Sequence, residues 1–136
     1  MQHYTPIQIR FNDIDVLNHV NNTIYMQFFD LGRLAIFQEC LGGEISWSEV
    51  TPVLVHLDVD FAAPIFLESQ VRVNTYITKF GNKSFRMEQN IENTATGEIH
   101  CKSKSILVAF NPKTNGGVPV PDSWREKLSV YSEPTL

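Results

Sequence analysis

The sequence is poor in basic residues and in cysteine. Its 136 residues include 11 Lys and Arg against 15 Asp and Glu, so the formal net charge is −4. A nucleic-acid-binding protein usually carries a basic excess, and this balance argues against that class. The two cysteines, Cys40 and Cys101, lie far apart. Two buried free thiols in a reducing compartment explain them more simply than a disulfide does.

Long apolar runs and targeting features are also lacking. No uninterrupted apolar stretch approaches the roughly 18 residues that a membrane span needs. The segment Met1–Pro6 has no charged region followed by an apolar core, unlike a secretory signal. We therefore expect a single soluble, cytoplasmic domain over residues 1–136, because one core usually covers about 100–200 residues.

Motifs of several enzyme classes are missing. The chain has no Gly-x-Ser-x-Gly nucleophile elbow and no phosphate-binding glycine loop. Neither cysteine stands beside a histidine in a loop. Hydrolysis by a serine or cysteine nucleophile is therefore not indicated.

The chain does contain one long apolar segment that predicts a helix. Apolar residues between 24 and 41 fill more than one helical face, so other structure must cover the helix. Asn21 or Asn22 can cap its start, and Gly42-Gly43 can end it. Gly32, in its interior, indicates a place where a strand backbone comes close.

Alternating apolar and polar residues predict an antiparallel sheet. The segments with this pattern are 7–11, 53–61, 71–77, 85–92 and 98–110. Turns are predicted at 81–82 and 94–97, a bulge or bend near Ser105, and a short helix over 123–128. A flat sheet cannot cover the long helix, so we predict an α+β fold whose sheet curls around it. Its free edges favour pairing with a second copy.

The junction between the first strand and the helix, residues 10–22, is dense in polar groups. Free N–H groups at a helix start can polarise a carbonyl, and a carboxylate beside them forms a plausible catalytic pair. Asp15 is the candidate carboxylate, although aspartate is also a common turn or capping residue. We expect Asp13 to have a structural or supporting role. Arg33, inside the apolar helix, is expected to pair with an acid or with backbone carbonyls.

The motif Asp15-x-x-x-His19-Val20-Asn21-Asn22-x-x-Tyr25 resembles hot-dog-fold acyl-CoA thioesterases of the 4-hydroxybenzoyl-CoA thioesterase type. The likeness covers nearly the whole chain, and it includes Asp60-Phe61-x-x-Pro64, Gly81-x-x-Ser84 and Pro119-x-Pro121 at similar intervals. Asn18 stands where many members carry glycine, but asparagine tolerates left-handed backbone better than most residues.

This resemblance implies a fold, an assembly and an activity. In this family the helix lies inside a curled sheet of about five strands. Two copies join their sheets edge to edge, and the active sites lie at the interface between the subunits. We therefore expect a homodimer and, further, a homotetramer. The implied reaction converts an acyl-CoA thioester to free acid and coenzyme A, without a metal or another cofactor. By motif, Asp15 is the catalytic carboxylate, and the backbone N–H of Asn22 holds the oxyanion.

The chemistry of a thioester fits these two roles. The carbonyl oxygen gains negative charge as its carbon becomes tetrahedral, and N–H donors at a helix start stabilise that charge. The thiolate leaves without an acid, because its thiol has a pKa near 8.5 by analogy with cysteine. Asp15 can act as a nucleophile or as a general base towards water, and the sequence leaves both open.

The remaining candidates are substrate-binding residues. His19, Asn21 and Tyr25 are expected to fix the loop or to line the pocket. His56 is a candidate for lining the rim of the pocket from across the dimer interface. The simpler alternative is that His56, Asp58 and Asp60 form the outer polar face of a strand. Lys83 and Ser84, at the turn near 81–82, are candidates for contacting coenzyme A. The alternative for Lys83 is a solvated hairpin charge.

Two other functions remain open from the sequence. A hot-dog hydratase or dehydratase would act on hydroxyacyl thioesters through a histidine and an acid. A non-catalytic module would bind acyl-CoA without turning it over. Hydration of a crotonyl thioester, or binding without release of thiol, would distinguish these from a thioesterase.

Overall fold

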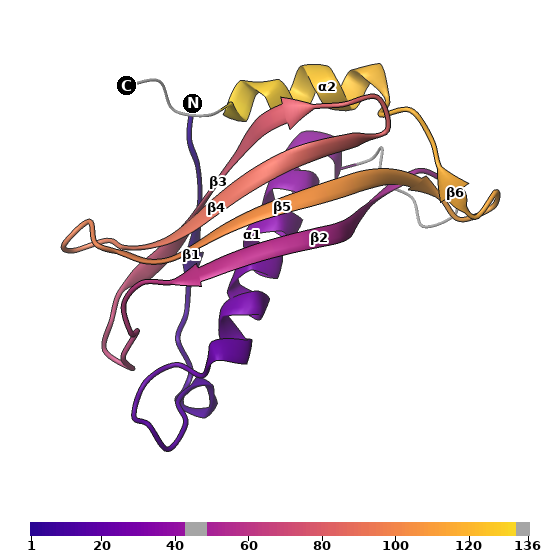
Figure 1. Ribbon diagram of the computed structural model, residues 1–136. Helices are drawn as coiled ribbons and strands as arrows, with labels where there is room; N and C mark the ends of the chain where they lie inside the picture. Colours follow the sequence, from indigo (N-terminus) through magenta and orange to yellow (C-terminus); the bar gives the residue numbers. More distant parts are fainter. Residues whose placement is uncertain (43–48, 133–136) are drawn as a thin grey trace.

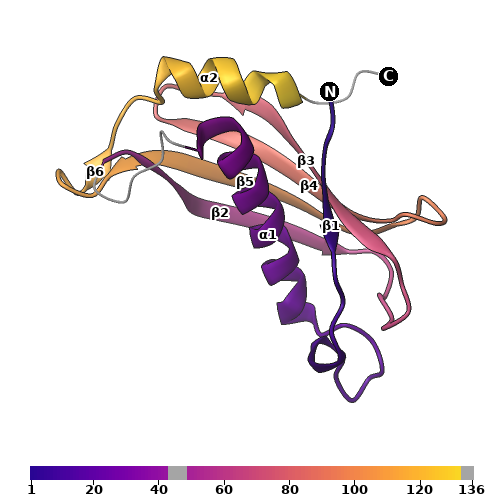
Figure 2. The same ribbon diagram turned by 180° about the vertical axis from the view of Figure 1, so that it is seen from behind.

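A computed structural model describes residues 1–42 and 49–132. The elements are β1 (His3–Ile7), α1 (Asn22–Leu41), β2 (Thr51–Phe61), β3 (Val71–Phe80), β4 (Ser84–Asn93), β5 (Ile99–Asn111), β6 (Gly116–Gly117) and α2 (Asp122–Leu128). All paired strands are antiparallel, in the order β1-β3-β4-β5-β2, and β6 pairs with β5. Figures 1 and 2 show the long helix lying along one face of the curved sheet. The predicted α+β hot-dog architecture is confirmed.

The helix α1 begins and ends as its sequence predicts. The Asn21 side chain caps it by accepting a hydrogen bond from the Thr23 N–H, and Gly42 is the residue after its last turn. Gly43, the second residue of the predicted stop, lies outside the described residues. A Cβ on Gly32 would lie 2.8 Å from both Gln89 Nε2 and Val73 Cγ1. The sheet does come close at Gly32, but strand side chains make the contact, and the predicted approach of a strand backbone is wrong.

Two hydrophobic clusters pack under α1, one beneath each half. The cluster under the first half includes Tyr25, Phe28 and Phe29, while the cluster under the second half includes Phe37 and Trp124. Within the described residues, neither helix has the length and apolar character that crossing a membrane requires.

A buried polar group lies between these clusters. Gln89 is fully buried; it donates to the Phe29 carbonyl at 3.0 Å and to Thr75 Oγ1 at 3.1 Å, and it accepts from Arg33 at 3.0 Å. Arg33 also forms an ion pair with Asp30. The predicted pairing of Arg33 with an acid is confirmed, and each of these buried groups has the partner that burial demands.

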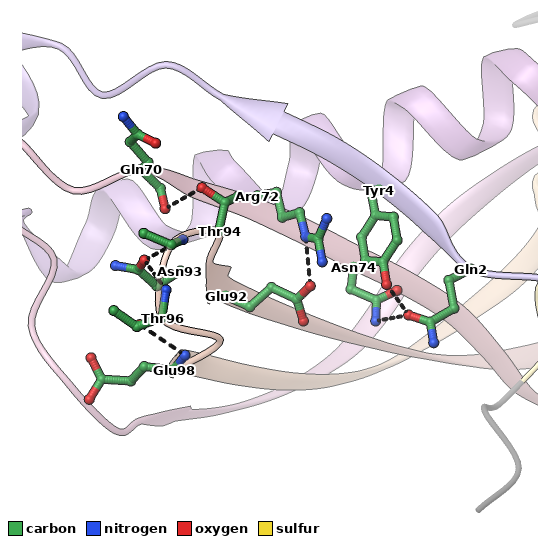
Figure 3. A network of polar contacts seen from close by, with 11 residues as sticks. Gln2, Tyr4, Gln70, Arg72, Asn74, Glu92, Asn93, Thr94, Thr96 and Glu98 are labelled. Atoms are coloured by element: carbon green, nitrogen blue, oxygen red, sulfur yellow. Dashed lines mark hydrogen bonds and ion pairs between the residues drawn. The ribbon is translucent and has the colours of Figure 1, made fainter.

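Polar contacts stabilise the edge of the sheet at which β1 pairs with β3 (Figure 3). Arg72 lies over the Tyr4 ring at 3.7 Å and donates to Glu92 at 2.7 Å. Asn74 donates to Gln2 at 3.0 Å. β1 is therefore the outermost strand on this side of the sheet, as β2 is on the other side.

The strand β2 is less covered than its alternation predicts. It pairs only with β5, and a register shift between Leu54 and His56 places Val55 in a bulge. Val53, Leu54 and Val55 are 36%, 38% and 58% exposed. An edge strand with apolar side chains in solvent is a surface that commonly pairs with another chain.

Two details of the predicted strands are wrong. The first strand spans His3–Ile7, and Phe11 begins a 3-10 turn with its side chain 80% exposed. The bulge predicted near Ser105 in β5 instead belongs to β2, opposite that region, while the extra residue of β5 is His100. In both cases, local turns and strand pairing override a short apolar alternation.

Candidate active site

The loop before α1 is built on Asp13. Its buried carboxylate accepts hydrogen bonds from the Arg10 backbone N–H at 2.8 Å and from the Arg10 guanidinium at 3.0 Å. Its carbonyl oxygen accepts the N–H of Asn21 at 2.9 Å. The Val20 N–H donates to the Ile65 carbonyl at 2.8 Å. Asp13 thus has the expected supporting role, and the loop is tied to the segment after β2.

Asp15 sits in a closed turn of this loop. Its carbonyl oxygen accepts the Asn18 N–H at 3.0 Å, and Asn18 adopts the left-handed region with φ 67°. One carboxylate oxygen accepts the Leu17 N–H at 2.9 Å, and the other accepts from Asn21 Nδ2 at 2.9 Å. The carboxylate is half-buried. Asp15 therefore shapes the turn and also faces the start of α1.

Asn21 joins the carboxylate to the helix. Its Oδ1 accepts hydrogen bonds from Thr23 N at 2.9 Å and Thr23 Oγ1 at 2.6 Å, while its Nδ2 holds Asp15. Asn22 is the first helical residue, so its N–H has no acceptor within the helix. One amide side chain thus places a carboxylate beside the positive end of a helix.

A cleft of about 260 Å³ opens beside this helix start. One wall consists of His19, Asn22 and Tyr25, and the other is residues 61–64. The Tyr25 ring is buried and packs edge-on against Phe61 with centroids 5.2 Å apart. Burial raises the pKa of Tyr25, opposed by a backbone hydrogen bond with Ile65. His19 Nδ1 lies 3.3 Å from the Val20 carbonyl, in keeping with a loop-fixing, cleft-lining role.

The structure brings five of the predicted site residues together and leaves three elsewhere. Asp15, His19, Asn21, Asn22 and Tyr25 gather at the start of α1. The three that lie away within one chain are His56, Lys83 and Ser84. The hairpin that carries Lys83 and Ser84 contacts α2 through Arg125, at the other end of α1 (Figure 1). These three roles stay predictions.

The outer face of the sheet carries paired charges. His56 Nε2 lies 3.1 Å from Asp58 Oδ2, and Lys104 lies 3.7 Å from Glu88. A wider cleft there, of about 650 Å³, is lined by charged and polar side chains that include Asp58 and Asp60. Among residues 1–42 and 49–132, no three His, Cys, Asp or Glu side chains converge as metal ligands would.

The sequence did not assign a role to the second wall of the cleft. The Asp60-Phe61-x-x-Pro64 pattern supported the resemblance, but it gave no indication that Ala62 and Ala63 face the helix start. Alanine has no chemistry of its own, so only the fold reveals this position.

Several proteins that resemble this chain in sequence or fold are named as thioesterases. The FadM long-chain acyl-CoA thioesterase of Escherichia coli strain K12 is 23% identical over 127 residues, which cover 91% of this chain and 95% of FadM. A predicted thioesterase from Bacillus stearothermophilus superposes with a TM-score of 0.89 at 28% identity, covering 99% of both chains.

A thioesterase from Thermus thermophilus, complexed with coenzyme A and Zn, has a TM-score of 0.79 at 28% identity and covers 92% of this chain and 95% of its own. The family model described as the Thioesterase-like superfamily matches residues 9–128, nearly the whole chain. This protein therefore belongs to the Thioesterase-like superfamily and is a thioester hydrolase.

Proposed function

We propose that the protein hydrolyses acyl-CoA thioesters to a free carboxylic acid and coenzyme A, with Asp15 as the reactive carboxylate. The observation that carries this proposal is the Asn21 side chain, which holds Asp15 at 2.9 Å while it caps α1. FadM acts on long-chain acyl-CoA, and the T. thermophilus structure contains coenzyme A, so the class of substrate is supported by relatives.

The proposed reaction uses the helix start as its oxyanion site. Asp15 either attacks the thioester carbon or takes a proton from the water that attacks it. The carbonyl oxygen then gains charge, which the Asn22 N–H stabilises; a single donor of this kind contributes about 2.7–4 kcal/mol in other enzymes. The C–S bond breaks, and the thiolate of coenzyme A leaves. After attack by water the free acid is formed directly; after attack by Asp15 a second step follows, in which water hydrolyses the mixed anhydride, releases the acid and restores the carboxylate. This chemistry is complete without a metal, and we propose that the enzyme needs none.

We also propose a homodimer that forms through the open edge of β2. This edge has unpaired backbone groups and exposed apolar side chains, and the same strand ends at Phe61, in the wall of the cleft. A second copy would therefore lie next to the cleft and could bring His56, Lys83 or Ser84 to it. Leu31 and Leu34, exposed on α1, support a further contact that would make a tetramer.

Two finer statements stay predictions. Assignment to the 4-hydroxybenzoyl-CoA type rests on the motif around Asp15 and His19. A cytoplasmic location rests on the thiols of Cys40 and Cys101, which are both free in the structure.

Release of thiol from short-chain, medium-chain, long-chain and aromatic acyl-CoAs tests the function. We expect steady turnover of at least one of these substrates, with no loss after dialysis against a chelator. Binding of acyl-CoA without release of thiol would contradict the proposal and favour the binding module. Hydration of crotonyl-CoA without release of thiol would favour a hydratase.

A further inference from the structure

The second wall of the cleft is a backbone segment that follows the end of β2. Its residues Ala62 and Ala63 face the helix start that carries Asn22 and Tyr25. The side chains of Ala62 and Ala63 are single methyl groups, too short to hold this part of the wall in position. The position of Ala62 and Ala63 must therefore be fixed by groups that lie behind the cleft.

His100 holds this segment from behind. Its carbonyl oxygen accepts two backbone hydrogen bonds, from Ala62 N at 2.9 Å and from Ala63 N at 3.1 Å. Its ring Nδ1 lies 3.4 Å from the Ala63 carbonyl oxygen. The pairing of β4 with β5 passes from Cys101 directly to Ile99, so His100 is the extra residue of a bulge. The bulge turns its ring inward, and the residue is 3% exposed.

Asn93 decides which ring nitrogen carries the proton. Asn93 Oδ1 accepts the N–H groups of Ala95 at 2.9 Å and Thr96 at 3.1 Å, in the turn that Figure 3 shows. Its Nδ2 is therefore the atom that faces His100 Nε2, at 3.4 Å. Nδ2 can only donate, so Nε2 accepts and the proton is on Nδ1. Glu98, at 3.9 Å from Nε2, is beyond hydrogen-bond distance.

We propose that His100 is a positioning residue for thioester hydrolysis, holding the Ala62–Ala63 wall through an Nδ1–H donor whose tautomer Asn93 sets. The inference rests on the proposed function only for its effect on turnover. A wall that moves by about 1 Å can reduce a rate about 100-fold, because the thioester is no longer aligned with its oxyanion donor. The ring itself lies behind the wall and touches no reacting atom.

Two amide substitutions separate the two ring nitrogens. In His100→Asn the side-chain N–H takes the place of Nδ1 and can still reach the Ala63 carbonyl. In His100→Gln the amide takes the place of Nε2, so it meets Asn93 and loses Ala63. The two variants are similar in polarity, and a general effect on folding should lower their melting temperatures equally.

We expect His100→Asn to keep kcat within about threefold of the wild type, while His100→Gln loses about 10-fold to 100-fold in kcat with KM changed by less than about threefold. Equal kcat values for the two variants at equal melting temperatures would overturn the proposal.

The tautomer is measured without any activity assay. A two-bond ¹H–¹⁵N correlation spectrum of the wild-type protein should show the His100 proton on Nδ1 and none on Nε2 at neutral pH. A proton on Nε2 would overturn the proposal even if both variants failed to fold. Lack of thioesterase activity in the wild type would instead refute the proposed function and leave the spectrum as the test of His100.

Discussion

Replacing Asn21 by aspartate would separate the two bonds that its side chain makes. Aspartate is as good a helix cap as asparagine, so the bond from Thr23 N to the side-chain oxygen is kept. The other side-chain atom changes from an N–H donor, 2.9 Å from the Asp15 carboxylate, to a second carboxylate oxygen. The helix should remain stable, while the site gains a repulsion.

The size of this repulsion follows from the geometry. Two unit charges about 4 Å apart interact with about 4 kcal/mol at an effective dielectric constant of about 20. Both side chains are half-buried, so solvent screening leaves about 1–2 kcal/mol. The pair should therefore hold a shared proton up to a pH about one unit higher than a lone carboxylate does.

The assay is the pH dependence of kcat/KM with the best acyl-CoA substrate. For Asn21→Asp we expect the acid limb of the profile to move upward by about one pH unit. Asn21→Ser is the matched control, because serine caps the helix but cannot reach Asp15. It should lose about 10-fold in kcat/KM, since a hydrogen bond to a charged group contributes about 1.5 kcal/mol or more. Its acid limb should move less than that of Asn21→Asp, because serine removes a donor to the carboxylate without adding a second charge. An unmoved acid limb in Asn21→Asp would show that the two side chains do not interact as proposed.

Three further changes test the fold and the assembly. Gly32→Ala should lower the free energy of unfolding by about 1–3 kcal/mol in urea titrations, because the added methyl group has no space; an unchanged midpoint would contradict this. Val55→Glu should convert a dimer to monomers in light scattering, while Val130→Glu, at a position 47% exposed outside the sheet, should not. A hydrogen bond to Glu39 raises the pKa of Tyr131 to about 12. The stability that this hydrogen bond contributes is therefore complete below about pH 10 and is lost between about pH 10 and pH 12. The melting temperature of Tyr131→Phe should fall less steeply over that interval than that of the wild type, and equal slopes would argue against the bond.

The elements with strong local chemistry could be predicted from the sequence. Asn21 as a cap and Gly42 as a stop bound α1 because capping depends on a few neighbouring atoms. The bounds of the first strand could not be predicted in this way. Residues 7–11 alternate as a strand would, but the Asp13 carboxylate accepts the Arg10 N–H and stabilises a turn there.

The residues of the candidate site could be predicted from the sequence only in part. Asp15 and Asn22 lie within one motif, so sequence distance and spatial distance agree there. His100 is 38 residues from Ala62 in the sequence, and it meets the cleft only because a bulge in β5 turns it inward. No local pattern encodes such a contact, since it depends on strand pairing across the sheet.

The role of Asp15 is tested most directly by kcat for Asp15→Asn with saturating acyl-CoA. Asparagine keeps the size of the side chain and can still accept the Leu17 N–H, but it can neither attack the thioester as a carboxylate nor remove a proton from water. We predict a fall in kcat of at least about 100-fold with little change in melting temperature. A kcat within a few fold of the wild type would contradict the assignment of Asp15 as the reactive carboxylate.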